Sequence, residues 1–141
     1  MIQTWQYFAL GSAFSAALTA IFGKIGVSEI PSNLATLIRT IVIFFVALAL
    51  VAWRSEWPKA GAISSHGLLF LVLSGVATGL SWLCYYHALA LAPASKVAPV
   101  DKMSVIFTLI LAFLFLGETP TVRIVIGGVL ITVGAVVIAL A

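Results

Sequence analysis

The sequence predicts an all-α protein, a polytopic membrane bundle of five transmembrane helices. Three observations lead to this prediction. Of the 141 residues, 63% are hydrophobic and 8% are charged, whereas soluble domains contain about 25% charged residues. The mean hydropathy is +1.25. Five apolar segments also approach the ~20 residues that a helix needs to cross a ~30 Å hydrocarbon layer.

We expect these segments to form one domain over residues 1–141, because no linker separates them. The predicted helices cover residues of about 7–25, 34–53, 67–91, 97–116 and 122–141. We do not expect the first segment to be a signal peptide, because Met1–Gln6 contains no Lys or Arg and four further segments follow it.

The connections carry the expected signals for helix ends. Gly26 should end the first helix, and Pro31 followed by Ser32 and Asn33 should open the second. The longest connection runs from Trp53 to His66, and Gly117 stands where the fourth helix should stop.

The stretch before the fourth helix is the most informative. Residues 91–96 should form a tight turn, and Pro93 and Pro99 disrupt regular helix. Asp101 and Lys102 follow, and the segment 105–116 after them carries no charge. A disrupted, charged helix entry joined to a lipid-compatible helix is typical of a polar site in a membrane protein.

The positions of tryptophans and small residues also agree with a bundle of transmembrane helices. Trp5, Trp53 and Trp57 fall at predicted boundaries on one side of the membrane, as an interfacial belt would. Small residues four apart favour close helix packing in lipid. They are Gly11, Ser15, Thr19 and Gly23 in the first helix, Gly75 and Gly79 in the third, and Gly128 and Thr132 in the fifth.

The polar residues fall into one membrane layer if successive helices alternate in direction. Arg39 lies about seven residues into the second helix, roughly 10 Å deep at about 1.5 Å per residue. Trp82 and Tyr86 are four apart and share a helix face. The expected solute-contacting residues are Lys24, Arg39, Trp82, Tyr86, His87 and Lys102, and Asp101 is the expected ion-coupling group.

Each of these residues also has a structural interpretation. Lys24 can extend to the headgroups, and His87 can be an interfacial residue held by hydrogen bonds. An arginine at the depth of Arg39 usually faces protein or a water-filled cavity. Asp101 can form an ion pair with Arg39 or Lys102, or it can titrate or contact a solute.

No enzyme, cofactor or metal chemistry is indicated. The sequence has no His-Glu-x-x-His motif, no phosphate-binding glycine loop and no paired carboxylates. The single Cys84 excludes an intrachain disulfide and a cysteine metal site. Seven Lys and Arg form no basic stripe with aromatic residues, so nucleic acid is not an expected partner.

Several short motifs, in order, resemble the EamA domain of the drug/metabolite transporter superfamily. They are Phe22-Gly23-Lys24 and the region of Arg39, Pro93-Ala94-Ser95, Val97-Ala98-Pro99, Phe107, Phe115-Leu116-Gly117-Glu118, and Gly127-Gly128-x-Leu130-Ile131-x-x-Gly134. The resemblance covers nearly the whole chain. It implies a five-helix unit, usually present twice in one chain as inverted repeats, that transports small metabolites and often exports them from the cytoplasm.

This chain has one such unit, so it supplies one half of the inverted-repeat transporter. We therefore expect a homodimer whose two copies lie in the same or in opposite orientations, although a separately encoded half is a further option. Small multidrug-resistance proteins are similar in size, but their first helix carries a glutamate that is absent here.

Two functions from different classes follow. The first is a secondary transporter, an exporter in the cytoplasmic (inner) membrane of a prokaryote, that moves a small metabolite or drug-like solute by alternating access. The alternative is a non-transporting membrane subunit that assembles with or stabilises a partner. The expected partners are the lipid bilayer, a small-molecule solute and a second copy.

Overall fold

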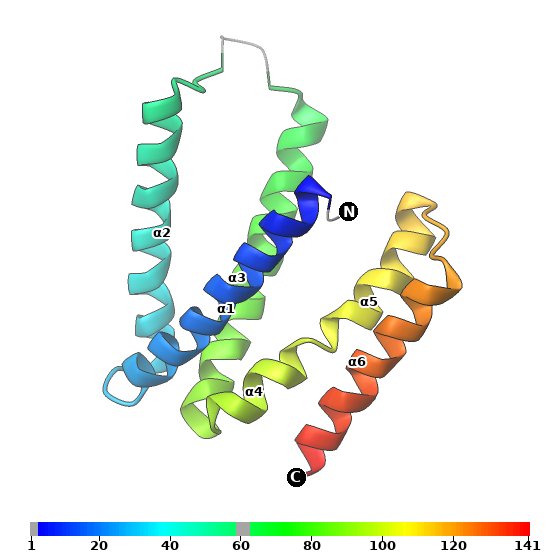
Figure 1. The fold of residues 1–141 in the computed structure, drawn as a ribbon. Helices are drawn as coiled ribbons and strands as arrows, with labels where there is room; N and C mark the ends of the chain where they lie inside the picture. The colour runs from blue at the N-terminus through cyan, green and yellow to red at the C-terminus, as the bar shows by residue number, and fades with distance from the viewer. Residues whose placement is uncertain (1–2, 59–62) are drawn as a thin grey trace. The chain divides into compact units, whose positions relative to one another are not determined.

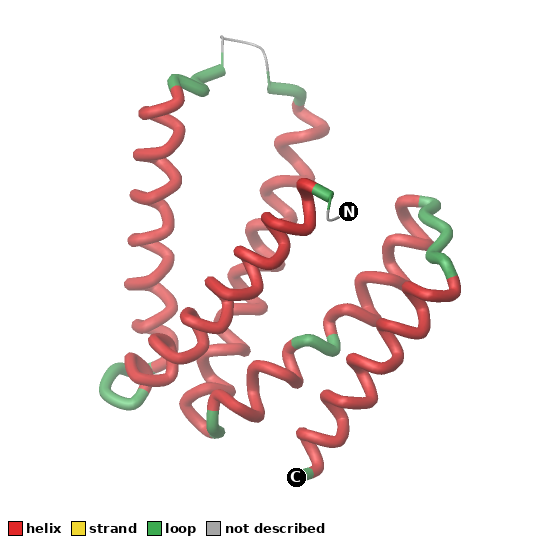
Figure 2. The backbone as a smooth tube through the Cα atoms, in the orientation of Figure 1, coloured by secondary structure: helices red, strands yellow, loops and turns green. Residues whose placement is uncertain are grey.

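The computed structural model describes residues 3–58 and 63–141, and every regular element within them is helical (Figures 1 and 2). The elements are α1 (Thr4–Val27), α2 (Ser32–Arg54), α3 (Ser65–Leu91), α4 (Ala94–Asp101), α5 (Ser104–Leu111), the π-helix η1 (Ala112–Leu116) and α6 (Val122–Leu140).

Five helical segments of the described chain are long and apolar enough to cross a membrane. Four are α1, α2, α3 and α6, and the fifth is the continuous segment Ala94–Leu116 that α4, α5 and η1 form together. The predicted fold class is therefore confirmed, and the chain is a multi-pass membrane protein. The predicted helix ranges begin and end within a few residues of the observed ones.

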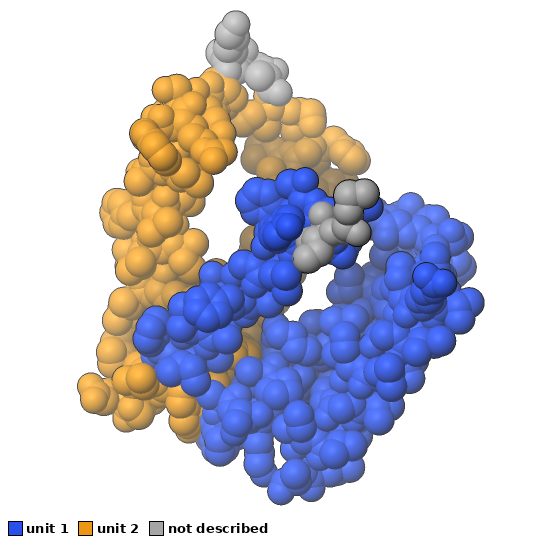
Figure 3. Space-filling view, in the orientation of Figure 1, with its two compact units in different colours: residues 1–22, 91–141 blue, residues 23–90 orange. Residues whose placement is uncertain are grey.

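The chain divides into two compact units, which Figure 3 shows in different colours. Unit 1 comprises residues 1–22 and 91–141, with the first part of α1 and the helices α4 to α6. Unit 2 comprises residues 23–90, with the end of α1 and the helices α2 and α3.

The fourth span differs from its prediction at its start. Its helix begins at Ala94 instead of Val97, because Pro93 adopts the extended N-cap conformation with φ −61° and ψ 142°. The turn predicted over residues 91–96 is thus only Ala92 and Pro93. At the other end, the last turn is π-helical and stops at Gly117, whose φ of 67° lies in the left-handed region. That stop was predicted.

The interruption of the fourth span lies after Asp101, later than the prolines suggested. Pro99 is inside α4 and has no N–H to donate to the preceding turn. Lys102 and Met103 then donate to the carbonyls of Pro99 and Val100, both at 3.0 Å. These i to i−3 bonds belong to a tighter helical turn. They keep the backbone hydrogen-bonded across the break, as a hydrocarbon environment requires.

Within unit 1, α4 and α5 pack against α6. The closest approach is at Gly128 of α6, where an added Cβ would lie 2.7 Å from Leu109 Cδ1 of α5. The neighbouring Gly127 has nothing within 4 Å of the same position. The small-residue packing predicted for the last helix therefore holds at Gly128, which is buried.

We predict that Gly128→Val destabilises the fold by about 1–3 kcal/mol, because overpacking at a close helix contact forces its neighbours apart. Gly127→Val is the matched control and should change the thermal midpoint of the detergent-solubilised protein much less. Adding Leu109→Ala to Gly128→Val should recover part of the loss. Equal destabilisation by the two valine variants would contradict the assigned contact.

Candidate functional site

Unit 2 contains a charged side chain that lies over aromatic rings. The guanidinium carbon of Arg39, on α2, lies 3.9 Å from the ring centroid of Trp82 and 5.4 Å from that of Tyr86, both on α3. Both distances are within the ~6 Å of a cation–π interaction. The structure thus brings together three of the predicted site residues, and Trp82 and Tyr86 share a face of α3, as their four-residue spacing predicts.

Tyr86 also packs α3 against the end of α1. An added Cβ on Gly23 would lie 3.1 Å from the Tyr86 hydroxyl oxygen and 3.2 Å from its Cζ atom. These contacts are tighter than most real Cβ contacts, so glycine at this position lets the ring approach the backbone of α1 without a shift. Tyr86 is 4% exposed. It is therefore a fixed support beneath the Arg39 guanidinium.

Lys24 has a structural role that the sequence analysis did not predict. Its Nζ donates a hydrogen bond of 2.6 Å to the backbone carbonyl of Leu89, near the C-terminal end of α3. In a continuing helix this carbonyl would accept from residue 93, but Pro93 has no N–H. Lys24 supplies the missing donor and places a positive charge where the helix dipole favours it.

The signal for this cap was present in the sequence. A proline four residues after Leu89 leaves that carbonyl without a helical donor, and Lys24 near the end of the first helix has a side chain long enough to reach it. The partner residue Leu89 is fully buried, and Gly23 beside Lys24 is buried too. We missed Leu89 and the supporting role of Gly23 because neither carries a functional group in its side chain.

The remaining predicted residues are placed as follows. His87 is exposed on α3. Asp101 and Lys102 belong to unit 1 and form an ion pair with each other, with 3.2 Å between Oδ2 and Nζ. Their side chains are 36% and 55% exposed, respectively. Of the two predicted ion-pair partners of Asp101, the described structure records Lys102. The convergence of both units on one solute site stays a prediction.

We predict that Lys24→Met lowers the free energy of unfolding by about 1–3 kcal/mol, the cost of leaving the Leu89 carbonyl buried without a donor. Lys96→Met removes the same charge from an exposed lysine and serves as the control. Thermal midpoints of the purified variants compare the two. If Lys24→Met is as stable as Lys96→Met, the cap does not contribute to stability.

Comparison with known proteins gives the chain its family. The EamA-like transporter family matches residues 3–140. A Sinorhizobium sp. protein named "Uncharacterized transporter in cobO 3'region" is 49% identical over 139 residues, which cover 99% of each chain. No solved structure matches. The resemblance predicted from the sequence is thus confirmed, and the chain belongs to the EamA-like transporter family.

Proposed function

We propose that the protein is a secondary transporter that exports a small metabolite or drug-like solute by alternating access. The observation that carries this proposal is the stacked guanidinium of Arg39 within the span Ser32–Arg54. An arginine in a transmembrane segment costs about 2.5–3.5 kcal/mol near the bilayer centre on insertion scales. A subunit that only assembles with a partner has little need for such a residue, which favours transport over the alternative function.

The interrupted fourth span supports alternating access. Discontinuous transmembrane helices are characteristic of secondary transporters, whose sites lie where helices break. Here the break separates α4 from α5 directly after Asp101, and short i to i−3 hydrogen bonds bridge it. Such a break lets two half-helices change their angle without leaving backbone groups unpaired. It also places Asp101, the one carboxylate within the five spans, beside the break.

We place the protein in the cytoplasmic membrane of a prokaryote, acting as a dimer of five-helix units. One five-helix unit provides half of the helices found in the usual member of the family, and a second copy is the simplest source of the rest. On α3, an added Cβ at Gly75 or at Gly79 would meet nothing within 4 Å. This open small-residue face is suited to close packing against another helix.

We predict that Asp101→Asn abolishes solute accumulation driven by a proton gradient while the protein remains folded. The carboxylate is the coupling group in this proposal, and an amide cannot carry the proton. The measurement is uptake of a solute panel by vesicles that contain only this chain, under imposed proton or sodium gradients. Glu118→Gln, in the connection before α6, is the control and should transport normally.

Two results would contradict this proposal. Undiminished proton-driven accumulation by Asp101→Asn would remove Asp101 from the coupling step. No accumulation of any solute by the unaltered chain under either gradient would favour the non-transporting subunit instead.

We further predict that the two copies insert in opposite orientations. An odd number of spans places the chain ends on opposite sides, so only opposite copies reproduce an inverted repeat. The positive charges give little bias. On this topology one side holds Arg54, Lys59 and Arg123, and the other holds Lys24, Lys96 and Lys102, with Arg39 near that end of its helix; Lys59 lies outside the described residues.

Cysteine labelling in intact cells tests this orientation. After replacement of Cys84, one cysteine replaces Ser55 and, in a second variant, one follows Ala141. Impermeant reagent should reach each site in about half of the molecules. Labelling of one site in all molecules and of the other in none would establish a single orientation, and a parallel or separately encoded partner would replace the antiparallel pair.

A further inference from the structure

We propose that Arg39 binds the anionic group of the solute, and that this solute is a small organic carboxylate. The inference deepens the proposed function and rests on it. The guanidinium of Arg39 lies over aromatic rings. Among the described residues, the recorded ion pairs are Arg54 with Glu56 and Lys102 with Asp101, and neither involves Arg39.

The stacking geometry leaves the donors of Arg39 available. The Trp82 ring centroid lies 3.9 Å from Cζ of Arg39, and an aromatic face does not occupy the five N–H donors as a carboxylate would. In the described chain Arg39 donates no side-chain hydrogen bond, and no buried side-chain nitrogen is left without a partner. Its nitrogens are therefore accessible, and the fork fits the two oxygens of a carboxylate.

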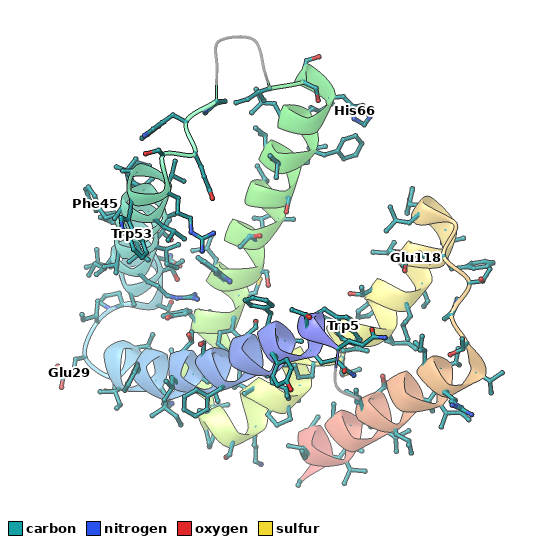
Figure 4. All side chains as sticks on the ribbon, turned by 45° about the horizontal axis from the view of Figure 1, so that its top comes forward. Trp5, Glu29, Phe45, Trp53, His66 and Glu118 are labelled. Atoms are coloured by element: carbon teal, nitrogen blue, oxygen red, sulfur yellow. The ribbon has the colours of Figure 1, made fainter. Side chains whose placement is uncertain are left out.

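The charges of unit 2 favour an anion over a cation. Its two acids, Glu29 and Glu56, both lie outside its spans. Glu29 is in the connection between α1 and α2, at the opposite end of α2 from Trp53 (Figure 4). Glu56 follows α2 and lies 3.6 Å from Arg54. A cationic solute beside Arg39 would thus meet a positive charge with no acid of unit 2 at the same depth.

The cluster is also held in position before any solute binds. Tyr86 is buried against the backbone of α1 at Gly23, and Leu89, one turn further along α3, carries the hydrogen bond from Lys24. Trp82 and Tyr86 are thus parts of an anchored helix end. A donor group that is already fixed loses little freedom when a ligand binds, which increases affinity.

Trp82 gives a direct readout of binding at Arg39. The chain has four tryptophans, and Trp5, Trp53 and Trp57 are all exposed, so replacing these three with phenylalanine leaves Trp82 as the reporter. We would titrate this variant in nanodiscs with benzoate, with the neutral isostere benzamide and with benzylamine. Benzoate should change the emission saturably at concentrations about tenfold or more below those of the other two, as expected for a charge-assisted hydrogen bond.

Variants of Arg39 and Arg54 test whether the benzoate-dependent change in Trp82 emission depends on Arg39. Arg39→Gln should remove the preference for benzoate, and Arg39→Lys, which keeps the charge but loses the fork, should weaken it several-fold. Arg54→Gln is the matched control, because Arg54 is exposed and paired with Glu56, and it should leave the titration unchanged. If Arg39→Gln does not fold, Arg39→Lys alone tests the proposal. Equal responses to benzoate and benzamide, or an unchanged response in the Arg39→Lys variant, would overturn it.

Transport of the same three labelled compounds by vesicles separates this inference from the proposed function. Transport of benzamide or benzylamine without selective benzoate binding would overturn the anion site and leave the transporter function standing. Selective, Arg39-dependent benzoate binding without transport of any compound would support the anion site and count against the transporter.

Discussion

The need to satisfy every backbone polar group inside a hydrocarbon layer shapes this structure more than any other constraint. Helices meet that need along their length, so the informative places are their ends and breaks. The Leu89 carbonyl receives a lysine, the break after Asp101 is bridged by i to i−3 bonds, and Glu118 N–H closes η1 on the Ala112 carbonyl at 3.2 Å. Threonine hydroxyls inside the spans likewise bond back to their own helices, as Thr36 does to Ser32.

The same constraint explains why Lys24 and Arg39, the two cations described above in unit 2, have different roles. Lys24 is a compact donor on a long stem, and its position near the end of α1 lets it complete a neighbouring helix terminus. Arg39 lies deeper and is stacked on rings that contribute no hydrogen-bond acceptor from their faces. An aromatic partner stabilises the positive charge in a poorly solvated place and leaves the donors unused. The Arg39 side chain is thus stabilised by the rings while its N–H donors can still bind a ligand.

The sequence predicts the number of spans and part of the candidate site, but not the exact position of every helix end. Composition and segment length fix five spans, and the spacing of Trp82 and Tyr86 fixes their common face. The positions of Ala94 and of the break after Asp101 could not be predicted, because Pro93 and Pro99 signal disruption without saying on which side of each proline the helix resumes. Arg39 stacking on α3 depends on the approach of two helices, which no local pattern encodes.

The packing around Tyr86 shows how a site on flexible transmembrane helices can still be rigid. The ring contacts the backbone at Gly23 on one side and the Arg39 guanidinium on another, and it belongs to the same helix end that Lys24 caps. A Cβ at residue 23 would lie 3.1 Å from the Tyr86 hydroxyl oxygen, so the ring would have to shift by a few tenths of an ångström. Gly23 and Lys24 therefore act on the same helix end: the first contacts Tyr86, which lies against the guanidinium, and the second caps the Leu89 carbonyl one turn away.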